Sequence, residues 1–181
     1  YYPQILNGTN EIADLSQDNI LTISSDTFRN LTFRKLILPS SIIRLKKQAF
    51  AYSKIDEIVV PSASMVEENL FYCNYNLKKV VLPNNLRALP DSTFSSCINL
   101  CQVDLGSHLE RIGSFAFEGC QNLREISLPK TVMLIEDMAF ADCGVQKIEV
   151  PNITCINGTA FDGTELKYVY KGESVVYSAT K

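Results

Sequence analysis

Phenylalanine recurs along this chain at a nearly constant interval. Successive members are separated by 22, 21, 23, 23, 23 and 21 residues, and they are Phe28, Phe50, Phe71, Phe94, Phe117, Phe140 and Phe161. Between successive phenylalanines a proline or glycine directly follows a short apolar stretch. These residues are Pro39, Pro61, Pro83, Gly106, Pro129 and Pro151. Self-similarity with such a period is typical of a solenoid, in which each repeat contacts mainly its neighbours.

Each repeat has two parts. The first is a short run of alternating apolar residues that ends at proline, as in LREISLP at 123–129. A period of two predicts a strand with one face inward, and proline, which has no N–H, marks where pairing stops. The second part carries the motif A-F-x-x-C, as at 139–143. It has room for a turn, a few extended residues and one helical turn, but not for a long helix.

Stacking follows from the size of the repeat. A unit of about 22 residues hides too little surface to bury its own apolar side, whereas stacked units share one core. If the strands pair in parallel at about 4.8 Å, seven repeats form a stack roughly 30 Å tall. Equivalent side chains then form columns, and the phenylalanines are predicted to form one of them.

The stretch FAFEGCQNLREISLPKTVMLIEDMAFADC at 115–143 resembles the BspA-type leucine-rich repeat. The motif positions are Ala116, Phe117, Cys120, Leu123, Ile126, Leu128, Pro129, Val132, Ile135, Ala139, Phe140 and Cys143. The resemblance covers roughly residues 15–171. It implies a β-rich α/β solenoid, a right-handed leucine-rich repeat stack of about seven repeats of 21–23 residues. A parallel sheet is expected on one face, with short strands, turns or helical turns on the other.

We expect a single domain over residues 1–181, with repeats at 15–171. Residues 1–14 fit the repeat poorly and are interpreted as an N-terminal cap or a truncated repeat. Residues 172–181 are interpreted as a C-terminal cap, because a terminal repeat must cover an otherwise bare end of the core. The resemblance implies a last strand at 169–171 and a short helical cap near 173–179.

Composition excludes several classes of protein. The chain of 181 residues is 46% hydrophobic and 20% charged, which is typical of an ordered globular core. No apolar run approaches the roughly 18 residues that a membrane span needs, and a basic-then-apolar signal peptide does not occur at the start. Basic and acidic residues are interspersed and the net charge is −3, so we expect no nucleic-acid partner.

Four of the six cysteines recur near the equivalent position of the repeat: Cys73, Cys97, Cys120 and Cys143. They are predicted to form a column of buried thiols that act as small apolar residues. Cys101 and Cys155 lie outside that column. Cys101 aligns with Lys78 and Arg124, which should contact solvent, so it is predicted to be the more reactive thiol.

The sequence contains no set of residues that predicts catalysis, a cofactor or a metal. His108 is the only histidine, and it lies in a turn where its spacing from the cysteines matches no structural zinc site. Glu136 and Asp137 are expected on a solvated face. We therefore predict a protein that is not an enzyme. Four N-x-S/T sequons also occur, at Asn7, Asn30, Asn152 and Asn157.

The outward face of the strands is the candidate binding surface. Ile37, Val59 and Val81 should lie side by side as an apolar strip, which is a candidate interaction site. The alternative is that branched residues simply favour strands wherever they lie. A neighbouring row alternates in charge, with Lys35 and Lys79 on either side of an acid, and it is expected to form pairs between strands.

Tyr168 and Tyr170 form a second, aromatic patch at the far end of the same face, of a kind enriched at interfaces. The candidate partner-binding residues are therefore Ile37, Val59, Val81, Lys35, Lys79, Tyr168 and Tyr170.

The resemblance implies an extracellular or cell-surface protein. Members of this family include adhesins that bind host matrix or plasma proteins, so one hypothesis is a monomeric protein-binding module of a surface or secreted protein. The alternative is a structural spacer or scaffold segment within a larger surface protein. The shared motif positions are core positions, so the resemblance identifies no binding residue.

Overall fold

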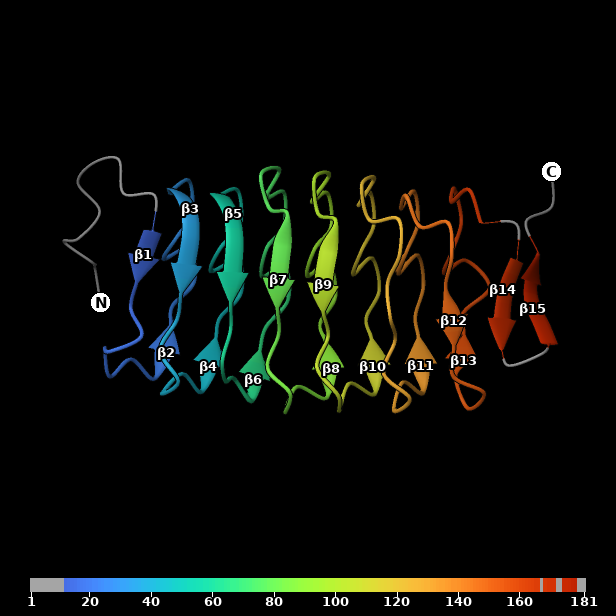
Figure 1. Ribbon diagram of the computed structural model, residues 1–181, viewed down its shortest axis with the longest axis horizontal. Coiled ribbons are helices and arrows are strands. Elements are labelled where there is room, and N and C mark those ends of the chain that lie inside the picture. The colour runs from blue at the N-terminus through green and yellow to red at the C-terminus, as the bar shows by residue number, and fades with distance from the viewer. Residues whose placement is uncertain (1–11, 167, 172–173, 179–181) are drawn as a thin grey trace.

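The computed structural model describes residues 12–166, 168–171 and 174–178, and it confirms the predicted stack. Over these residues it contains fifteen strands and no helix. The strands lie in two rows along the long axis of the molecule, and the chain passes from one row to the other in every repeat (Figure 1).

The longer strands form the predicted parallel sheet. Its order is β1-β3-β5-β7-β9, and the strands are β1 (Ile12–Asp14), β3 (Thr32–Ile37), β5 (Lys54–Val59), β7 (Lys79–Val81) and β9 (Gln102–Asp104). In the second half of β3 the side chains alternate: Leu36 is buried in the core, whereas its neighbours Lys35 and Ile37 are partly exposed on the outer face. Because β1 pairs with β3, residues 12–14 belong to this sheet, while residues 1–11 lie outside the described residues.

The second row consists of two-residue strands on the opposite side of the core. Three form one sheet: β2 (Thr22–Ile23), β4 (Arg44–Leu45) and β6 (Met65–Val66). Four form another: β8 (Ala88–Leu89), β10 (Arg111–Ile112), β11 (Leu134–Ile135) and β13 (Cys155–Ile156). One residue of most of these pairs is apolar and buried, so the core is closed from both sides.

The seven phenylalanines form one column, as predicted. Each ring stacks on the next, with centroids 5.0–5.3 Å apart and interplanar angles of 3–20°. All seven are at most 1% exposed. This column extends through the core from the first repeat to the last, so it couples every repeat to its neighbours.

Left-handed residues explain why turns, and no helix, surround the phenylalanines in the described chain: two flank each phenylalanine except Phe161, which has one. Positive φ occurs two residues before Phe at Asp26, Gln48, Asn69, Ser92, Phe115 and Met138. It also occurs two residues after Phe at Asn30, Tyr52, Cys73, Ser96, Gly119, Asp142 and Gly163. A helix requires consecutive negative φ, whereas these turns aim N–H groups at the next repeat, as in Phe94 N to Ala116 O at 2.8 Å.

The C-terminal end corrects one prediction. The strand expected at 169–171 exists as β14 (Tyr168–Lys171), and it pairs in parallel with β12 (Glu149–Val150). In place of the helical cap there is a strand, β15 (Ser174–Ser178), antiparallel to β14; residues 172, 173 and 179 lie outside the described residues. The physical reason is the sequence SVVYS, whose β-branched and aromatic residues favour pairing with a neighbouring strand.

Candidate functional site

The apolar strip occupies the centre of the parallel sheet. Ile37 is in register with Val59, and Val59 with Val81, so the three side chains lie on adjacent strands. Each is partly exposed. Asp14 continues the row before Ile37, and Asp104 continues it after Val81. The strip therefore spans about 10 Å across three strands and ends at a carboxylate on each side.

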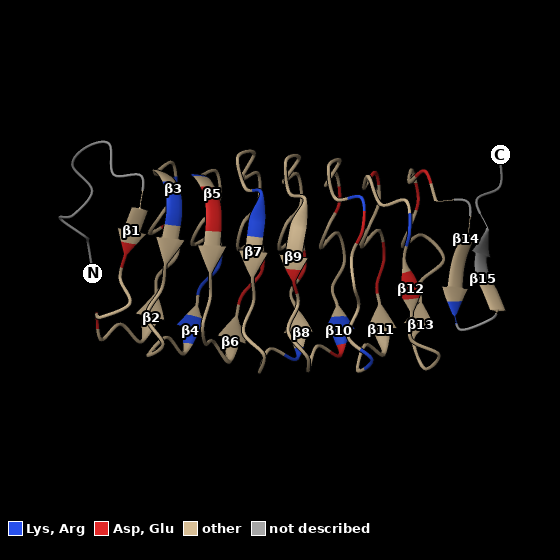
Figure 2. Ribbon diagram, in the orientation of Figure 1, with Lys and Arg blue, Asp and Glu red and all other residues tan. Residues whose placement is uncertain are grey.

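The neighbouring charged row also has the predicted register. Lys35 pairs with Glu57, and Glu57 with Lys79, as strand partners. Figure 2 shows the sign of charge changing from β3 to β5 to β7. The expected ion pairs are absent, however: over residues 12–166, none of these three side chains forms one. Three charges beside the apolar strip are therefore left for solvent or for a partner.

The parallel ladder is interrupted after β9. Residues 126–128 form no strand, and Glu125 makes only an isolated bridge with Lys147. Leu82 N donates to Asp104 O at 2.9 Å, whereas within the described chain the equivalent N–H groups of Leu38, Leu105 and Leu128 make no such bond. Leu128 is also partly exposed, whereas its counterparts in the repeat are at most 3% exposed. These counterparts are Leu15, Leu38, Val60, Leu82, Leu105 and Val150.

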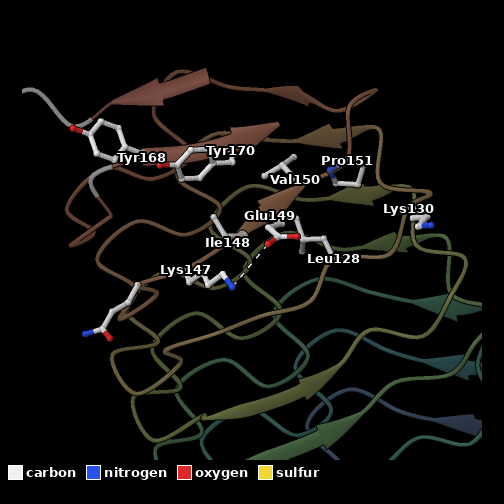
Figure 3. Close-up of a pocket in the computed structure, with 10 residues that line it drawn as sticks. Leu128, Lys130, Lys147, Ile148, Glu149, Val150, Pro151, Tyr168 and Tyr170 are labelled. Carbon is white, nitrogen blue, oxygen red and sulfur yellow. Dashed lines mark ion pairs between the residues drawn. The ribbon is translucent and has the colours of Figure 1, made fainter. Parts of the chain in front are cut away.

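A hollow of about 420 Å³ lies at this interruption, which we call the C-terminal hollow. It is lined by Leu128, Lys130, Gln146, Lys147, Ile148, Glu149, Val150, Pro151, Tyr168 and Tyr170. In Figure 3 the two tyrosines flank one side, Lys130 and Lys147 lie toward opposite ends, and Leu128 lies between the lysines. A second hollow of about 330 Å³ adjoins it through Leu128 and Glu149. The described chain thus has an elongated depression at the C-terminal end of the sheet.

Aromatic and charged groups define the chemistry of the C-terminal hollow. The rings of Tyr168 and Tyr170, 51% and 46% exposed, are 6.3 Å apart and tilted by 54°. Lys147 Nζ lies 3.9 Å from Glu149 Oε1, and both side chains are highly exposed, so this ion pair is weak. Lys130 has no ion pair within the described residues. The hollow combines an apolar base, two aromatic faces and a surplus of positive charge.

The cysteine column is confirmed in part. Cys97, Cys120 and Cys143 are buried, and burial raises the pKa of all three thiols, that of Cys143 to about 11. Cys73 is buried too, but its place in the column was predicted wrongly. It occupies a left-handed turn position, so Asn74, three residues after Phe71, is the column member.

Asn74 introduces a polar pair into this column. Its Nδ2 donates to Ser53 Oγ at 2.7 Å, and Ser53 Oγ in turn donates to Phe50 O at 2.7 Å. Oδ1 of Asn74 has no hydrogen-bond partner among the described atoms although the residue is fully buried. An unpaired buried acceptor destabilises the fold.

The remaining predicted groups belong neither to the apolar strip nor to the lining of the C-terminal hollow. Cys101 and Cys155 are exposed, and His108 is exposed in its turn, with Nδ1 2.9 Å from Asn84 O. Glu136 is partly exposed and Asp137 is exposed, as expected of a solvated face, and Arg111 Nη2 lies 2.6 Å from Glu136 Oε2. In the described ranges, no cluster of ligating side chains could hold a metal ion, and no helix could cross a bilayer.

Three of the four sequon asparagines, Asn30, Asn152 and Asn157, are exposed, and Asn7 lies outside the described residues.

Two features were not foreseen from the sequence. The C-terminal hollow depends on the interrupted ladder, and no sequence signal marked that interruption. An aromatic group near the other end of the stack could have been found by aligning the repeats on phenylalanine. There the Arg29 guanidinium lies 4.5 Å from the Tyr52 ring centroid, and Tyr52 contacts Tyr72 edge to face at 5.6 Å. The Arg29 guanidinium is already engaged by the Tyr52 ring and by an ion pair with Asp26.

Comparison with known proteins gives one family and several similar folds. The sequence pattern of the BspA type leucine rich repeat region, in six copies, matches residues 9–111 and 87–179. A search of curated proteins gave no significant match. A leucine-rich repeat protein from Bacteroides ovatus is 23% identical with a TM-score of 0.63, over 82% of this chain and 52% of that one.

Two further solved structures are similar at lower identity. The leucine-rich repeat protein of T. pallidum is 19% identical with a TM-score of 0.61, over 75% of this chain and 74% of that one. The pneumococcal vaccine antigen PcpA is 20% identical with a TM-score of 0.54, over 85% of this chain and 36% of that one. At these identities the similarity concerns the fold, and the chain spans about half the length of the B. ovatus protein.

Proposed function

Because the chain belongs to the BspA type leucine-rich repeat family, we propose that it is a protein-binding module of a cell-surface or secreted protein, without enzymatic activity. Its partner lies along the parallel sheet. The T. pallidum and pneumococcal proteins are similar in fold only, and one of them is described as a vaccine antigen, which is consistent with a surface location.

The apolar strip is the observation that carries this proposal. Ile37, Val59 and Val81 offer contiguous apolar surface on rigid strands, and the adjacent Lys35 and Lys79 have no ion pair in the described chain. Protein interfaces commonly combine an apolar centre, which excludes water, with charged residues at the rim, which pair with the partner and provide specificity. β-propensity alone accounts for the branched residues but not for unpaired charges beside them.

The test is capture followed by direct measurement. The domain is immobilised and exposed to surface proteins extracted from host or neighbouring cells, and a retained protein is purified and its Kd measured. Val59→Asp and Val81→Asp each place a charge on the strip without burying it in the core. Each is expected to raise Kd by about tenfold or more, equivalent to about 1.4 kcal/mol.

Met133→Asp is the matched control, because Met133 is 49% exposed on the opposite side of the stack. It is expected to leave Kd unchanged. Circular dichroism verifies that all three variants fold. If the folded Val59 and Val81 variants bind as tightly as the unaltered chain, the strip is not the binding surface.

A structural spacer is the second candidate, favoured by one observation. The phenylalanine column stacks without interruption through seven repeats, which makes a stiff rod. A spacer predicts that no protein is retained in the same capture experiment, and that changing the strip has no effect on the function of the larger protein.

A further inference from the structure

The interruption of the parallel ladder exposes a part of the core that every other repeat buries. Leu128 is partly exposed, and its N–H has no backbone acceptor within the described chain, so one repeat offers both an apolar side chain and a hydrogen-bond donor. Both lie at the C-terminal hollow, where Leu128 is part of the lining. A ligand could cover the Leu128 side chain and accept a hydrogen bond from the Leu128 N–H.

The shape of the C-terminal hollow matches an extended segment of peptide. The lining follows the chain from Gln146 to Pro151, which includes β12, and this distance of about 17 Å corresponds to about five residues of extended peptide. The volume of about 420 Å³ accommodates a bulky side chain against Leu128 and Val150. Tyr168 and Tyr170 form a rigid aromatic wall along this path, which costs little entropy to use.

The charges that line the C-terminal hollow indicate which charged side chain the peptide segment carries. Lys130 has no ion pair in the described residues, and Lys147 is only weakly engaged by Glu149 at 3.9 Å. The lining therefore holds two cations and one anion, and a carboxylate on the ligand would neutralise the surplus.

We infer that the C-terminal hollow anchors the partner protein through an extended segment in which a bulky aliphatic residue precedes an acidic one. The inference rests on the proposed function and identifies the chemistry of the partner. The aliphatic side chain covers Leu128, a main-chain oxygen accepts from the Leu128 N–H, and the carboxylate lies at Lys130.

The test uses a blocked pentapeptide, Ser-Leu-Leu-Glu-Ser, added to isotope-labelled protein at about 1 mM and followed by amide NMR spectra. Shifts are expected at the amides of Leu128, of 146–150 and of Tyr170. Peptides with both leucines replaced by serine, or with glutamate replaced by lysine, should bind about tenfold more weakly. Absence of shifts at the hollow, or equal affinity of the three peptides, overturns the inference.

Charge reversal separates recognition from a merely structural effect. Lys130→Glu should weaken the glutamate peptide about tenfold and restore binding of the lysine peptide, which loss of structure cannot do. Lys54→Glu, the matched reversal of an exposed lysine in β5, should change neither affinity by more than about twofold. Failure of the rescue overturns the assignment of the carboxylate to Lys130.

Other occupants are outcomes of the same experiment. Shifts caused by a maltose oligosaccharide and not by the peptide would assign a sugar site, and shifts that depend on protein concentration alone would assign a second copy. Either result overturns the inference. The pentapeptide lies along the strands and therefore does not reach Val59, which is about 14 Å from Leu128 across three strand levels. Val59→Asp should therefore not change the affinity for the pentapeptide. If the pentapeptide fails to bind, the proposed function is still tested separately by the Kd of the captured protein for the Val59 and Val81 variants.

Discussion

Replacing Phe117 with alanine is expected to remove about 3 to 5 kcal/mol from the free energy of unfolding. The side chain is 0% exposed, and its ring stacks on Phe94 at 5.3 Å and on Phe140 at 5.0 Å. Exposing such a side chain costs about 1.5 to 3 kcal/mol, and each lost ring pair adds about 0.5 to 1.5 kcal/mol. Against a total stability of about 5 to 15 kcal/mol, the loss is a large fraction.

Urea unfolding followed by circular dichroism measures this loss. Phe115→Ala is the matched control. It deletes the same atoms, two residues before Phe117, but the Phe115 side chain is 37% exposed. The control is expected to stay within about 1 kcal/mol of the unaltered chain. If both variants lose the same stability, or if Phe117→Ala loses less than about 1 kcal/mol, the column does not have the structural role assigned to it.

Three further predictions concern single groups. Arg111 lowers the pKa of Glu136, so this pair stabilises the fold above the usual glutamate pKa of 4.5 and ceases to do so as the pH falls below it. Glu136→Gln should lower stability at neutral pH by about 1 kcal/mol or less, and thermal unfolding should show this difference vanishing in acid. An unchanged difference would contradict the ion pair. Iodoacetamide should modify Cys101 and Cys155 in the native protein, and mass spectrometry should find the four buried thiols modified only after unfolding. Asn74→Cys removes a buried unpaired acceptor and should raise the urea midpoint, by about 1 kcal/mol in free energy, whereas a loss of stability would show that the Ser53 contact matters more.

The sequence was sufficient to predict the features that recur in every repeat. The interval between phenylalanines predicted the ring column, and the alternation before each proline predicted the parallel strands and the register of Ile37 with Val59. These predictions succeed because one error in register would expose a whole face, so the pattern is strongly constrained. The register of the candidate strip could thus be predicted, whereas its unpaired charges could not, since side-chain rotamers determine them.

What failed to be predicted depends on departures from the repeat. Cys73 precedes the column position by one residue, because it lies two residues after Phe71, at the left-handed turn position, whereas the other three buried cysteines lie three residues after their phenylalanine. The strand β15 replaced the expected helix because an open strand edge on β14 was available for pairing. The C-terminal hollow arises where a ladder fails to form, and a strand-like sequence such as REISLP at 124–129 does not reveal that failure.

The reversal of direction between β14 and β15 limits how such an array can grow. A parallel ladder has polarity, and each level is a template for an identical next level, so alone it could lengthen indefinitely or recruit another molecule head to tail. β15 runs against this polarity and offers the wrong template. A duplicated unit can therefore extend the parallel ladder when it is inserted before β14, whereas β15 offers it no parallel neighbour.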